Sequence, residues 1–272
     1  MADILKQILK DKRIEVEQRK KETPVEVLQE KIGPLPKCRN FYTAVTRRNP
    51  RGINVIAEVK KASPSAGVIR ENFDPVEIAL TYERCGAEAV SVLTDEKYFQ
   101  GRLEYLTAVK DVVSLPVLRK DFIIDEYQIY EARAAGADAV LLIAEALTHA
   151  DLMDLLILAS RLTLTALIEV HGADSLLRVR SLIGFPQKHY SVLGINNRDL
   201  VTMQVDINNT GRLAELVENP RQVIAESGIR TRGDVEKLIR IGVGGVLIGR
   251  TLCESDSIEE KFKELFDIRG RK

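Results

Sequence analysis

The chain has 272 residues, 45% of them hydrophobic, and its 40 basic and 40 acidic residues leave no formal net charge. This length suits one α/β barrel with a large core, while the balanced charge argues against a nucleic-acid partner or an acidic tail. The three cysteines and three histidines are scattered without metal-ligand spacing, which predicts no metal site and a reducing compartment. Because no apolar run could span a membrane or serve as a signal core, we expect a cytoplasmic protein without a membrane partner.

Residues 1–46 precede the first predicted strand and should form a helical extension packed on the barrel, so that residues 1–272 make a single domain. An apolar stripe at helical spacing begins this segment: Ile4, Leu5, Ile8 and Leu9. Thr23 is expected to cap a second helix whose first position is Pro24, and Gly33 with the following proline ends it. The charged run 10–21 is expected to be a solvent-exposed helix face.

Strand and helix patterns then alternate at a spacing of about 25–30 residues, which is typical of repeated βα units. Gly86, Gly136 and Gly242 each end a helix in three similar junctions. Eight units with short connections predict a (β/α)8 TIM barrel, and no GxGxxG motif follows the first strand to favour a doubly wound sheet. Helices are expected at Asp74–Cys85, Asp125–Ala135 and Arg232–Ile241. The expected strands are Asn54–Val59, Ala89–Leu93, Pro116–Leu118, Ala139–Ile143, Thr165–Glu169, Val192–Asn196, Val223–Ala225 and Gly245–Ile248.

The first strand carries an acid and a base, Glu58 and Lys60, in an otherwise apolar run. Side chains at i and i+2 leave a strand on the same side, so both should point to one place near its C-terminal end. Burying a polar group without a partner costs roughly 2–7 kcal/mol, which makes this pair a candidate for chemistry. Pro64 places the segment 62–67 that follows in a loop.

Polar residues also stand at the ends of other predicted strands, where active sites of this fold gather. Lys120 follows the third strand, Glu169 ends the fifth, and Asn196 and Arg198 share a face at the end of the sixth. From the residues alone, Glu169 could equally be a solvated loop carboxylate, and Lys120 could be one of three surface charges. His171 is expected to be an ordinary loop histidine.

The seventh and eighth strands end in Ser227-Gly228 and Gly249-Arg250, whose backbone N–H groups could cradle a phosphate. Taken singly, either glycine could simply belong to a turn. Phe99 and Phe122 could wall a flat ring or fill the core. The whole set suits acid–base work on a phosphorylated substrate that carries a carboxylate, without a metal.

Six motifs in order and spacing resemble the indole-3-glycerol-phosphate synthase family: IAEVKKASPS, LRKDFI, LIEV, GINNRDL, AESGI and LIGR. The likeness covers nearly the whole chain, including a helical extension of the family's length. It implies conversion of 1-(2-carboxyphenylamino)-1-deoxyribulose 5-phosphate into indole-3-glycerol phosphate in tryptophan biosynthesis, without a cofactor. Other enzymes of that pathway are candidate partners.

The resemblance also implies roles for individual residues. Lys120 would be the general acid that protonates the substrate ketone, and Glu169 the acid–base partner in the dehydration. Glu58 and Asn196 would hold the sugar hydroxyls and the lysines, while Lys60 would lie near the substrate's charged groups. Ser63 and Arg198 would surround the carboxylate. The remaining substrate-binding positions are the ring walls Phe99, Phe122 and Leu141, the phosphate loops Ser227, Gly228, Gly249 and Arg250, and the neighbouring motif residues Glu226 and Leu247.

Two positions depart from the family pattern. Arg102 stands where many relatives have serine, so the loop after the second strand could reach differently over the mouth. Arg250 replaces a smaller or acidic residue, with little expected loss because backbone N–H groups bind the phosphate. Two other classes stay open at this point: a Schiff-base aldolase or isomerase, and a non-catalytic barrel that binds phosphorylated ligands.

Overall fold

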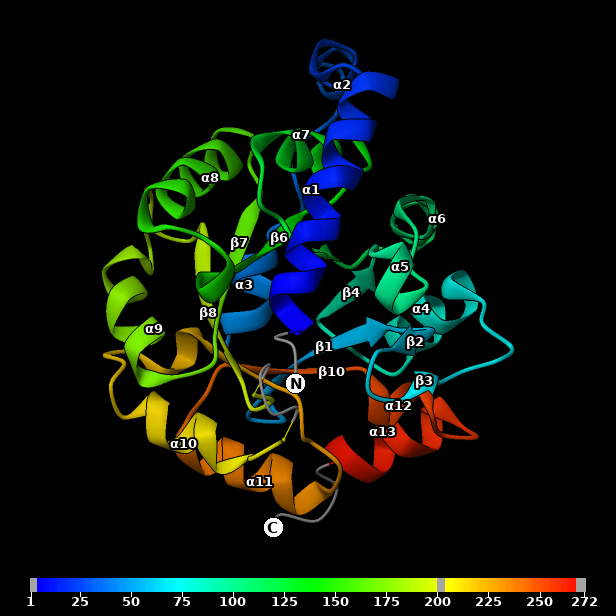
Figure 1. Ribbon diagram of the computed structural model, residues 1–272. Helices are drawn as coiled ribbons and strands as arrows, with labels where there is room; N and C mark the ends of the chain where they lie inside the picture. Colours follow the sequence, from blue (N-terminus) through cyan, green and yellow to red (C-terminus); the bar gives the residue numbers. More distant parts are fainter. Residues whose placement is uncertain (1–3, 200–203, 268–272) are drawn as a thin grey trace.

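The computed structural model describes residues 4–199 and 204–267. Eight parallel strands close into a barrel in the order β1-β10-β9-β8-β7-β6-β5-β4, with helices outside it (Figure 1). The predicted (β/α)8 barrel is therefore confirmed. The barrel strands are β1 (Asn54–Val59), β4 (Ala89–Leu93), β5 (Val117–Lys120), β6 (Ala139–Ile143), β7 (Thr165–Val170), β8 (Ser191–Asn196), β9 (Val223–Glu226) and β10 (Gly245–Ile248).

β1, β4, β6 and β10 have the predicted bounds, and β7, β8 and β9 differ by one residue at one end. β5 begins one residue later and ends two residues later than predicted. β5 and β9 continue into polar residues because backbone pairing continues there: Leu93 pairs with Lys120, and Leu247 pairs with Glu226. The sequence-based bounds stopped at the last apolar residue. This difference places Lys120 and Glu226 on the barrel wall instead of on loops.

The predicted helices are present, and Asp74 and Asp125 cap α4 and α7 by accepting backbone N–H bonds. Gly86, Gly136 and Gly242 have φ of 85°, 92° and 89°, as expected for helix ends that turn into buried strands. The helices after β1 are α4 (Pro75–Arg84), α5 (Glu96–Phe99), α6 (Leu103–Val112), α7 (Glu126–Ala134), α8 (His149–Arg161), α9 (Ala173–Val179), α10 (Asn208–Ala214), α11 (Arg232–Ile241), α12 (Arg250–Cys253) and α13 (Ile258–Phe266), with 3-10 turns η1 (Ala144–Ala146), η2 (Arg180–Leu182) and η3 (Pro220–Gln222).

Two apolar layers hold the barrel. The larger lies between the strands and the surrounding helices, and the smaller fills the barrel interior. Phe41 and Val45 of α3 (Phe41–Thr46) are fully buried and belong to the interior layer. Helix α3 thereby closes the end of the barrel at which the strands begin, and leaves the C-terminal ends of the strands for a site.

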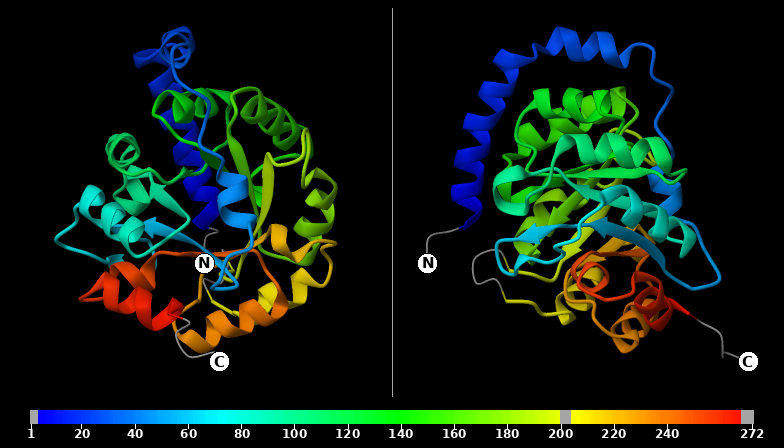
Figure 2. Two further views of the ribbon diagram at one scale, coloured as in Figure 1. Left: turned by 180° about the vertical axis from the view of Figure 1, so that it is seen from behind. Right: turned by 90° about the vertical axis from the view of Figure 1, so that its right-hand side faces the viewer.

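The N-terminal helices wrap from one end of the barrel to the other (Figure 2). α1 (Ile4–Glu22) runs across the side where the strands end, and α2 (Val25–Ile32) packs on α7 through Leu28 and Tyr127. Pro24 has a ψ of 151°, so it occupies the cap position of α2. The expectation that Thr23 caps this helix with Pro24 as its first residue was therefore wrong by one position.

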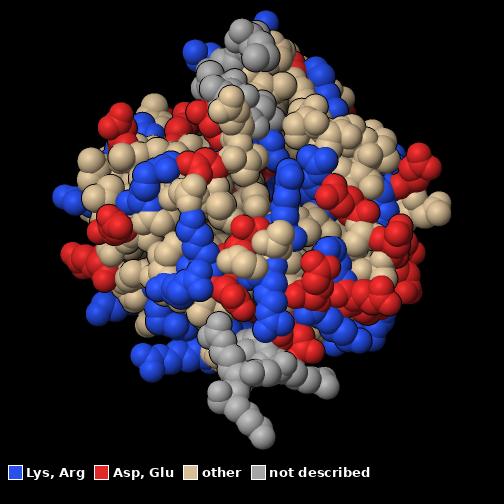
Figure 3. Space-filling model, turned by 90° about the horizontal axis from the view of Figure 1, so that it is seen from below, with Lys and Arg blue, Asp and Glu red and all other residues tan. Residues whose placement is uncertain are grey.

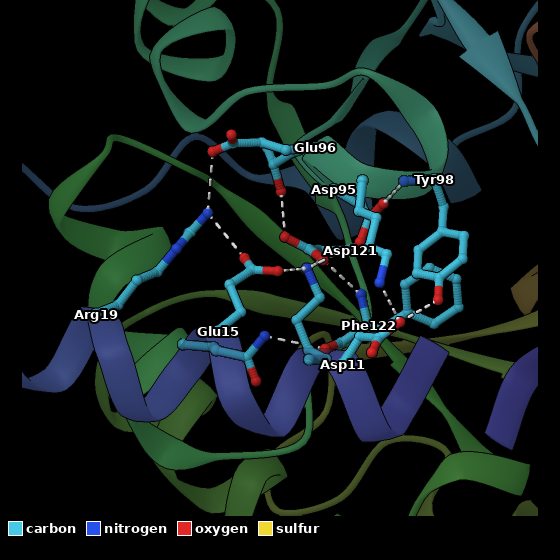
Figure 4. Close-up of polar contacts among 12 residues, drawn as sticks. Asp11, Glu15, Arg19, Asp95, Glu96, Tyr98, Asp121 and Phe122 are labelled. Atoms are coloured by element: carbon cyan, nitrogen blue, oxygen red, sulfur yellow. Dashed lines mark hydrogen bonds and ion pairs between the residues drawn. The ribbon is translucent and has the colours of Figure 1, made fainter. Parts of the chain in front are cut away.

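The charged run 10–21 of α1 is only partly solvent-exposed, so the sequence-based expectation holds for Lys10, Arg13, Glu17 and Lys21 but is wrong for Lys12 and Arg19. Lys12 is only 1% exposed, and its Nζ lies 2.9 Å from Asp95 Oδ2 and 3.0 Å from Asp121 Oδ1. Arg19 forms an ion pair with Glu131 at 3.1 Å. Figure 4 shows its further ion pairs, with Glu15 at 2.8 Å and Glu96 at 3.4 Å. Helical periodicity shows which residues share a face. It does not show the carboxylates after β4, after β5 and on α7 that this face meets.

Two smaller features complete the picture. The segment after β1, expected to be a loop, contains a short hairpin in which β2 (Ala62–Ser63) pairs with β3 (Gly67–Val68). Acidic and basic side chains are interspersed over the face in Figure 3. No helix within residues 4–199 and 204–267 is long and apolar enough to cross a membrane.

Candidate functional site

A cavity of about 170 Å³ opens at the C-terminal ends of the strands. Every site residue predicted from the sequence lines it. These residues come from seven of the eight barrel strands and from the segments that follow the strands. The set is Glu58, Lys60, Ser63, Phe99, Lys120, Phe122, Leu141, Glu169, Asn196, Arg198, Glu226, Ser227, Gly228, Leu247, Gly249 and Arg250. Arg102 lies outside the lining, as the exposed residue before α6.

Helix α1 contributes a wall that the sequence did not predict. Ile4, Leu5 and Ile8 line the cavity from α1. The network of Figure 4 holds this helix against the strand ends. Lys12 forms an ion pair with Asp121, the residue that follows Lys120 in the sequence. Tyr98 donates a hydrogen bond to Asp11. One of the charged residues that anchor the helix, Asp121, therefore directly follows a lysine of the site.

Glu58 and Lys60 form a close ion pair at the end of β1, with Glu58 buried. The backbone there is fixed because the Glu58 carbonyl accepts bonds from Tyr82 Oη at 3.0 Å and Cys253 Sγ at 3.3 Å. A Cβ atom at position 249 would collide with the Glu58 carboxylate. Gly249 thus makes room for this acid as well as ending β10.

Lys120 is not a surface charge, since its side chain is 14% exposed and faces two carboxylates. Its Nζ lies 3.2 Å from Glu169 Oε2 and 3.5 Å from Glu226 Oε2. Burial alone would lower the pKa of Lys120, but Glu169, Glu226 and Glu58 together raise it above its ordinary value. The lysine is therefore charged throughout the neutral range.

Glu169 and Glu226 are neighbouring buried carboxyl groups with opposite pKa shifts. Burial and the nearby charge of Glu169 raise the pKa of Glu226 well above its ordinary value. Burial also opposes ionisation of Glu169, but Lys120 and His171 outweigh it and hold its pKa well below the ordinary value. One proton is therefore carried by Glu226, and Glu169 is the ionised member. The Glu226 carboxyl occupies the space that a Cβ atom would fill at Gly194 on β8.

Asn196 and Arg198 share a face at the end of β8, as predicted. Asn196 donates from Nδ2 to Glu169 Oε1 at 3.2 Å, and its Oδ1 accepts the Arg198 backbone N–H at 3.0 Å. Burial and the charges of Arg250 and Arg230 lower the pKa of the Arg198 guanidinium. Three cationic groups thus converge on one side of the cavity, which favours an anionic ligand there.

The aromatic and phosphate-loop residues also face the cavity. The rings of Phe99 and Phe122 lie 6.1 Å apart at their centroids with a tilt of 39°. Ser227 and Gly228 have φ of 64° and 80°, a left-handed turn directly after β9. The Arg250 side chain is 44% exposed and its Nε bonds Glu254 at 2.9 Å, so part of its charge is already paired.

His171 does not line the cavity, but it contacts Glu169 of the site, a contact that sequence reasoning missed. Instead of an ordinary loop histidine, it is a half-buried group whose Nε2 lies 3.3 Å from Glu169 Oε1. Its Nδ1 lies 3.1 Å from Glu145 Oε2. The i, i+2 relation to Glu169 at the end of β7 was the available signal. Among the described residues, no group of three His, Cys, Asp or Glu side chains could hold a metal ion.

The family model described as "Indole-3-glycerol phosphate synthase" matches residues 5–265. An indole-3-glycerol phosphate synthase of Prochlorococcus marinus is 45% identical over 269 residues, covering 97% of this chain and 89% of that protein. One of Acidithiobacillus ferrooxidans is 45% identical over 267 residues, covering 98% and 99%.

Solved structures with low sequence identity share the fold. A 3-hexulose-6-phosphate synthase has a TM-score of 0.63 at 14% identity, covering 79% of this chain and 99% of that one. A chain of the tryptophan synthase complex from Pyrococcus furiosus has a TM-score of 0.55 at 14% identity, covering 80% and 98%. These two likenesses concern the barrel alone.

Proposed function

The chain belongs to the indole-3-glycerol phosphate synthase family, and on that premise we propose how its residues share the reaction. The enzyme is a carboxy-lyase of tryptophan biosynthesis. It closes the second ring of 1-(2-carboxyphenylamino)-1-deoxyribulose 5-phosphate and releases carbon dioxide and water. One observation supports the division of roles most strongly: Glu58, Lys120 and Glu169 approach one another in a single cavity that also holds the glycine-rich strand ends.

Substrate orientation is the first task. The phosphate would lie at Ser227-Gly228 and Gly249-Arg250, and the carboxylate near Lys60, Ser63 and Arg198. Phe99, Phe122 and Leu141 would hold the aromatic ring between these anchors. Fixing both ends of the substrate presses the ring carbon against the ketone carbon. Orientation of this kind lowers the activation barrier by up to roughly 7–11 kcal/mol.

Lys120 would act in ring closure. As the ring carbon bonds to the ketone carbon, the carbonyl oxygen takes a proton from the Lys120 ammonium and becomes a hydroxyl. The raised pKa of Lys120 in the free enzyme keeps the proton in place until an alkoxide, a stronger base than an amine, develops beside it. Carbon dioxide then leaves, and the electrons of the broken C–C bond restore the aromatic ring.

Glu169 would act in the dehydration. Its carboxylate takes the proton from the carbon beside the nitrogen and returns a proton to the departing hydroxyl, which leaves as water. Lys120 regains its proton from solvent, so each turnover consumes one proton in all. Glu58 and Asn196 would hold the sugar hydroxyls and the two lysines during these steps, with Glu58 paired to Lys60 and Asn196 to Glu169.

The family excludes the alternatives of an aldolase, an isomerase and a non-catalytic barrel. The electrostatics of the site point the same way, because an amine must be neutral to form a Schiff base and Lys120 has a raised pKa. We also infer a cytoplasmic location, which the three free cysteines support.

The test of the proposed roles is substrate conversion followed by indole fluorescence. Lys120→Ala is expected to abolish turnover while substrate affinity stays within about tenfold, as for a group that acts in the transition state. Lys61→Ala is the matched control, since Lys61 lies near the site without lining the cavity. Near-normal turnover of Lys120→Ala would contradict the assignment of the acid.

A further inference from the structure

His171 directly follows β7 and lies between two carboxylates. On one side its Nε2 is 3.3 Å from Glu169 Oε1, an ion pair whose angle falls outside hydrogen-bond geometry. On the other side its Nδ1 is 3.1 Å from Glu145 Oε2, and its backbone N–H donates to Glu145 Oε1 at 2.9 Å. Asn209 of α10 donates to the His171 carbonyl at 3.0 Å. Both the ring and the backbone of this residue are therefore fixed.

We propose that His171 is a positioning residue for Glu169, which it holds in the orientation and the ionised form that the dehydration needs. This inference rests on the acid–base role proposed for Glu169. It adds a residue, His171, and an outer partner, Glu145, to the machinery of the site.

Orientation follows from how the oxygens of Glu169 are shared. Oε1 is taken by Asn196 Nδ2 at 3.2 Å and by His171, so Oε2 is the oxygen that meets Lys120. Without the imidazole, one restraint on Oε1 is lost and the carboxylate could rotate away from the substrate. Misplacement by about 1 Å at a reacting group is enough to cost a hundredfold in rate.

The charge of His171 follows from its two partners. A neutral imidazole has one N–H and one lone pair, so one ring nitrogen would present its lone pair to a carboxylate oxygen. Only the imidazolium has no lone pair facing a carboxylate and places a positive charge beside both Glu145 and Glu169. Burial would lower the pKa of His171, but these two carboxylates raise it to about 10. His171 is therefore a cation at neutral pH.

The positive charge of His171 stabilises the ionised form of Glu169, so that the proton that Glu169 and Glu226 could share stays on Glu226. Four charged or titratable groups surround the contact: Glu145 from η1, Glu169 from β7, and Lys120 and Glu226 beyond it. Lys120 and His171 lie on opposite sides of Glu169, whereas Glu226 keeps the proton. Loss of His171 would make the proton easier to transfer to Glu169, and the base would be available only at higher pH.

The experiment measures kcat and KM against pH for His171→Ala, His171→Gln and the exposed control His149→Gln. We expect kcat at pH 7 to fall about tenfold or more in both His171 variants, with KM within about threefold of wild type. The acid limb of the kcat profile should move upward by about one pH unit, because a positive neighbour of Glu169 is gone. His171→Gln should be faster than His171→Ala because its amide can still contact Glu169. Its acid limb should remain at the higher pH, because the amide carries no positive charge. His149→Gln should match wild type.

A second variant keeps the proposal testable if the His171 variants do not fold. Glu145→Gln leaves His171 in place but removes its outer carboxylate, and it should move the acid limb in the same direction by a smaller amount. An unmoved limb in the His171 variants, or in Glu145→Gln if the former do not fold, would overturn the proposal. A fall in kcat without any movement of the limb would also overturn it.

Glu169→Gln separates this inference from the proposed role of Glu169. If Glu169→Gln lowers kcat by about 10²–10⁴ and adding His171→Gln lowers the residual kcat no further, both proposals are supported. If Glu169→Gln turns over normally, the role of Glu169 itself is wrong. If Glu169→Gln is inactive but the His171 variants behave as wild type, only the present inference fails.

Discussion

Replacing Lys12 with methionine should separate α1 from the barrel mouth. The ammonium of Lys12 is ion-paired at 2.8 Å to Glu15, 2.9 Å to Asp95 and 3.0 Å to Asp121. Methionine keeps most of the side-chain volume but deprives the buried carboxylates of Asp95 and Asp121 of the Lys12 ammonium. Breaking a buried pair in this way costs about 3–5 kcal/mol.

The lower end of that range applies here, because Asp121 keeps two other partners. Arg119 Nη2 lies 3.1 Å from Asp121 Oδ2, and Thr94 Oγ1 donates to the same oxygen at 2.6 Å. A loss of about 3 kcal/mol corresponds to roughly a hundredfold change in an equilibrium constant. Since Ile4, Leu5 and Ile8 of α1 line the cavity, undocking of α1 should also raise KM.

The assay is native-state hydrogen exchange of the α1 amides together with denaturant unfolding. Exchange in α1 should accelerate about a hundredfold in Lys12→Met and stay unchanged in the exposed control Lys10→Met. Asp121→Asn combined with Lys12→Met should lose less than the sum of the single changes, because the two groups interact directly. Unchanged α1 exchange in Lys12→Met would refute the view that this buried cation anchors the helix.

The remaining predictions concern the site. Glu169→Gln should lower kcat by about 10²–10⁴ with KM within tenfold, in steady-state assays; a rise in KM alone would count against an acid–base role. Gly249→Ala should lower kcat strongly, because a Cβ atom there collides with the Glu58 carboxylate, whereas Gly33→Ala should not. Arg250→Ala should raise KM by only about twofold to fivefold, since its guanidinium is half-exposed and partly paired; a hundredfold rise would show that it carries the phosphate site. The unfolding free energy of wild type minus that of His171→Gln should be largest below pH 6.5 and fall by roughly 2–4 kcal/mol towards pH 10, because the folded pKa of His171 is raised to about 10; a difference constant with pH would contradict this.

Much of the site could be predicted from the sequence because strand ends converge in this fold. A buried strand with Glu58 and Lys60 on one side, and glycines after β9 and β10, fixes which end of the barrel carries the chemistry. The apolar pattern placed four strands at their observed bounds. It ended β5 and β9 too early, because strand pairing there continues through polar residues that the pattern counts as loop.

The parts that the sequence did not yield depend on contacts between distant segments. The burial of Lys12 depends on Asp95 and Asp121, about a hundred residues away, and no local pattern distinguishes it from an exposed helix lysine. The same holds for the wall that α1 adds to the cavity. His171 lies two residues after Glu169 on the same side of the strand. Its fixed orientation and its charge also depend on Glu145, which belongs to the preceding βα unit and cannot be placed from the local sequence.

The central claim is that one cavity holds the phosphate and the aromatic ring while Lys120 meets the ketone oxygen. A crystal structure with the substrate in which the ketone is reduced to an alcohol tests it most directly. The account predicts the phosphate against Ser227-Gly228 and Gly249-Arg250, and the aromatic ring against the wall that Phe99, Phe122 and Leu141 form. It also predicts the alcohol oxygen within hydrogen-bond distance of Lys120 Nζ. An alcohol oxygen far from Lys120, with the phosphate bound elsewhere, would contradict it.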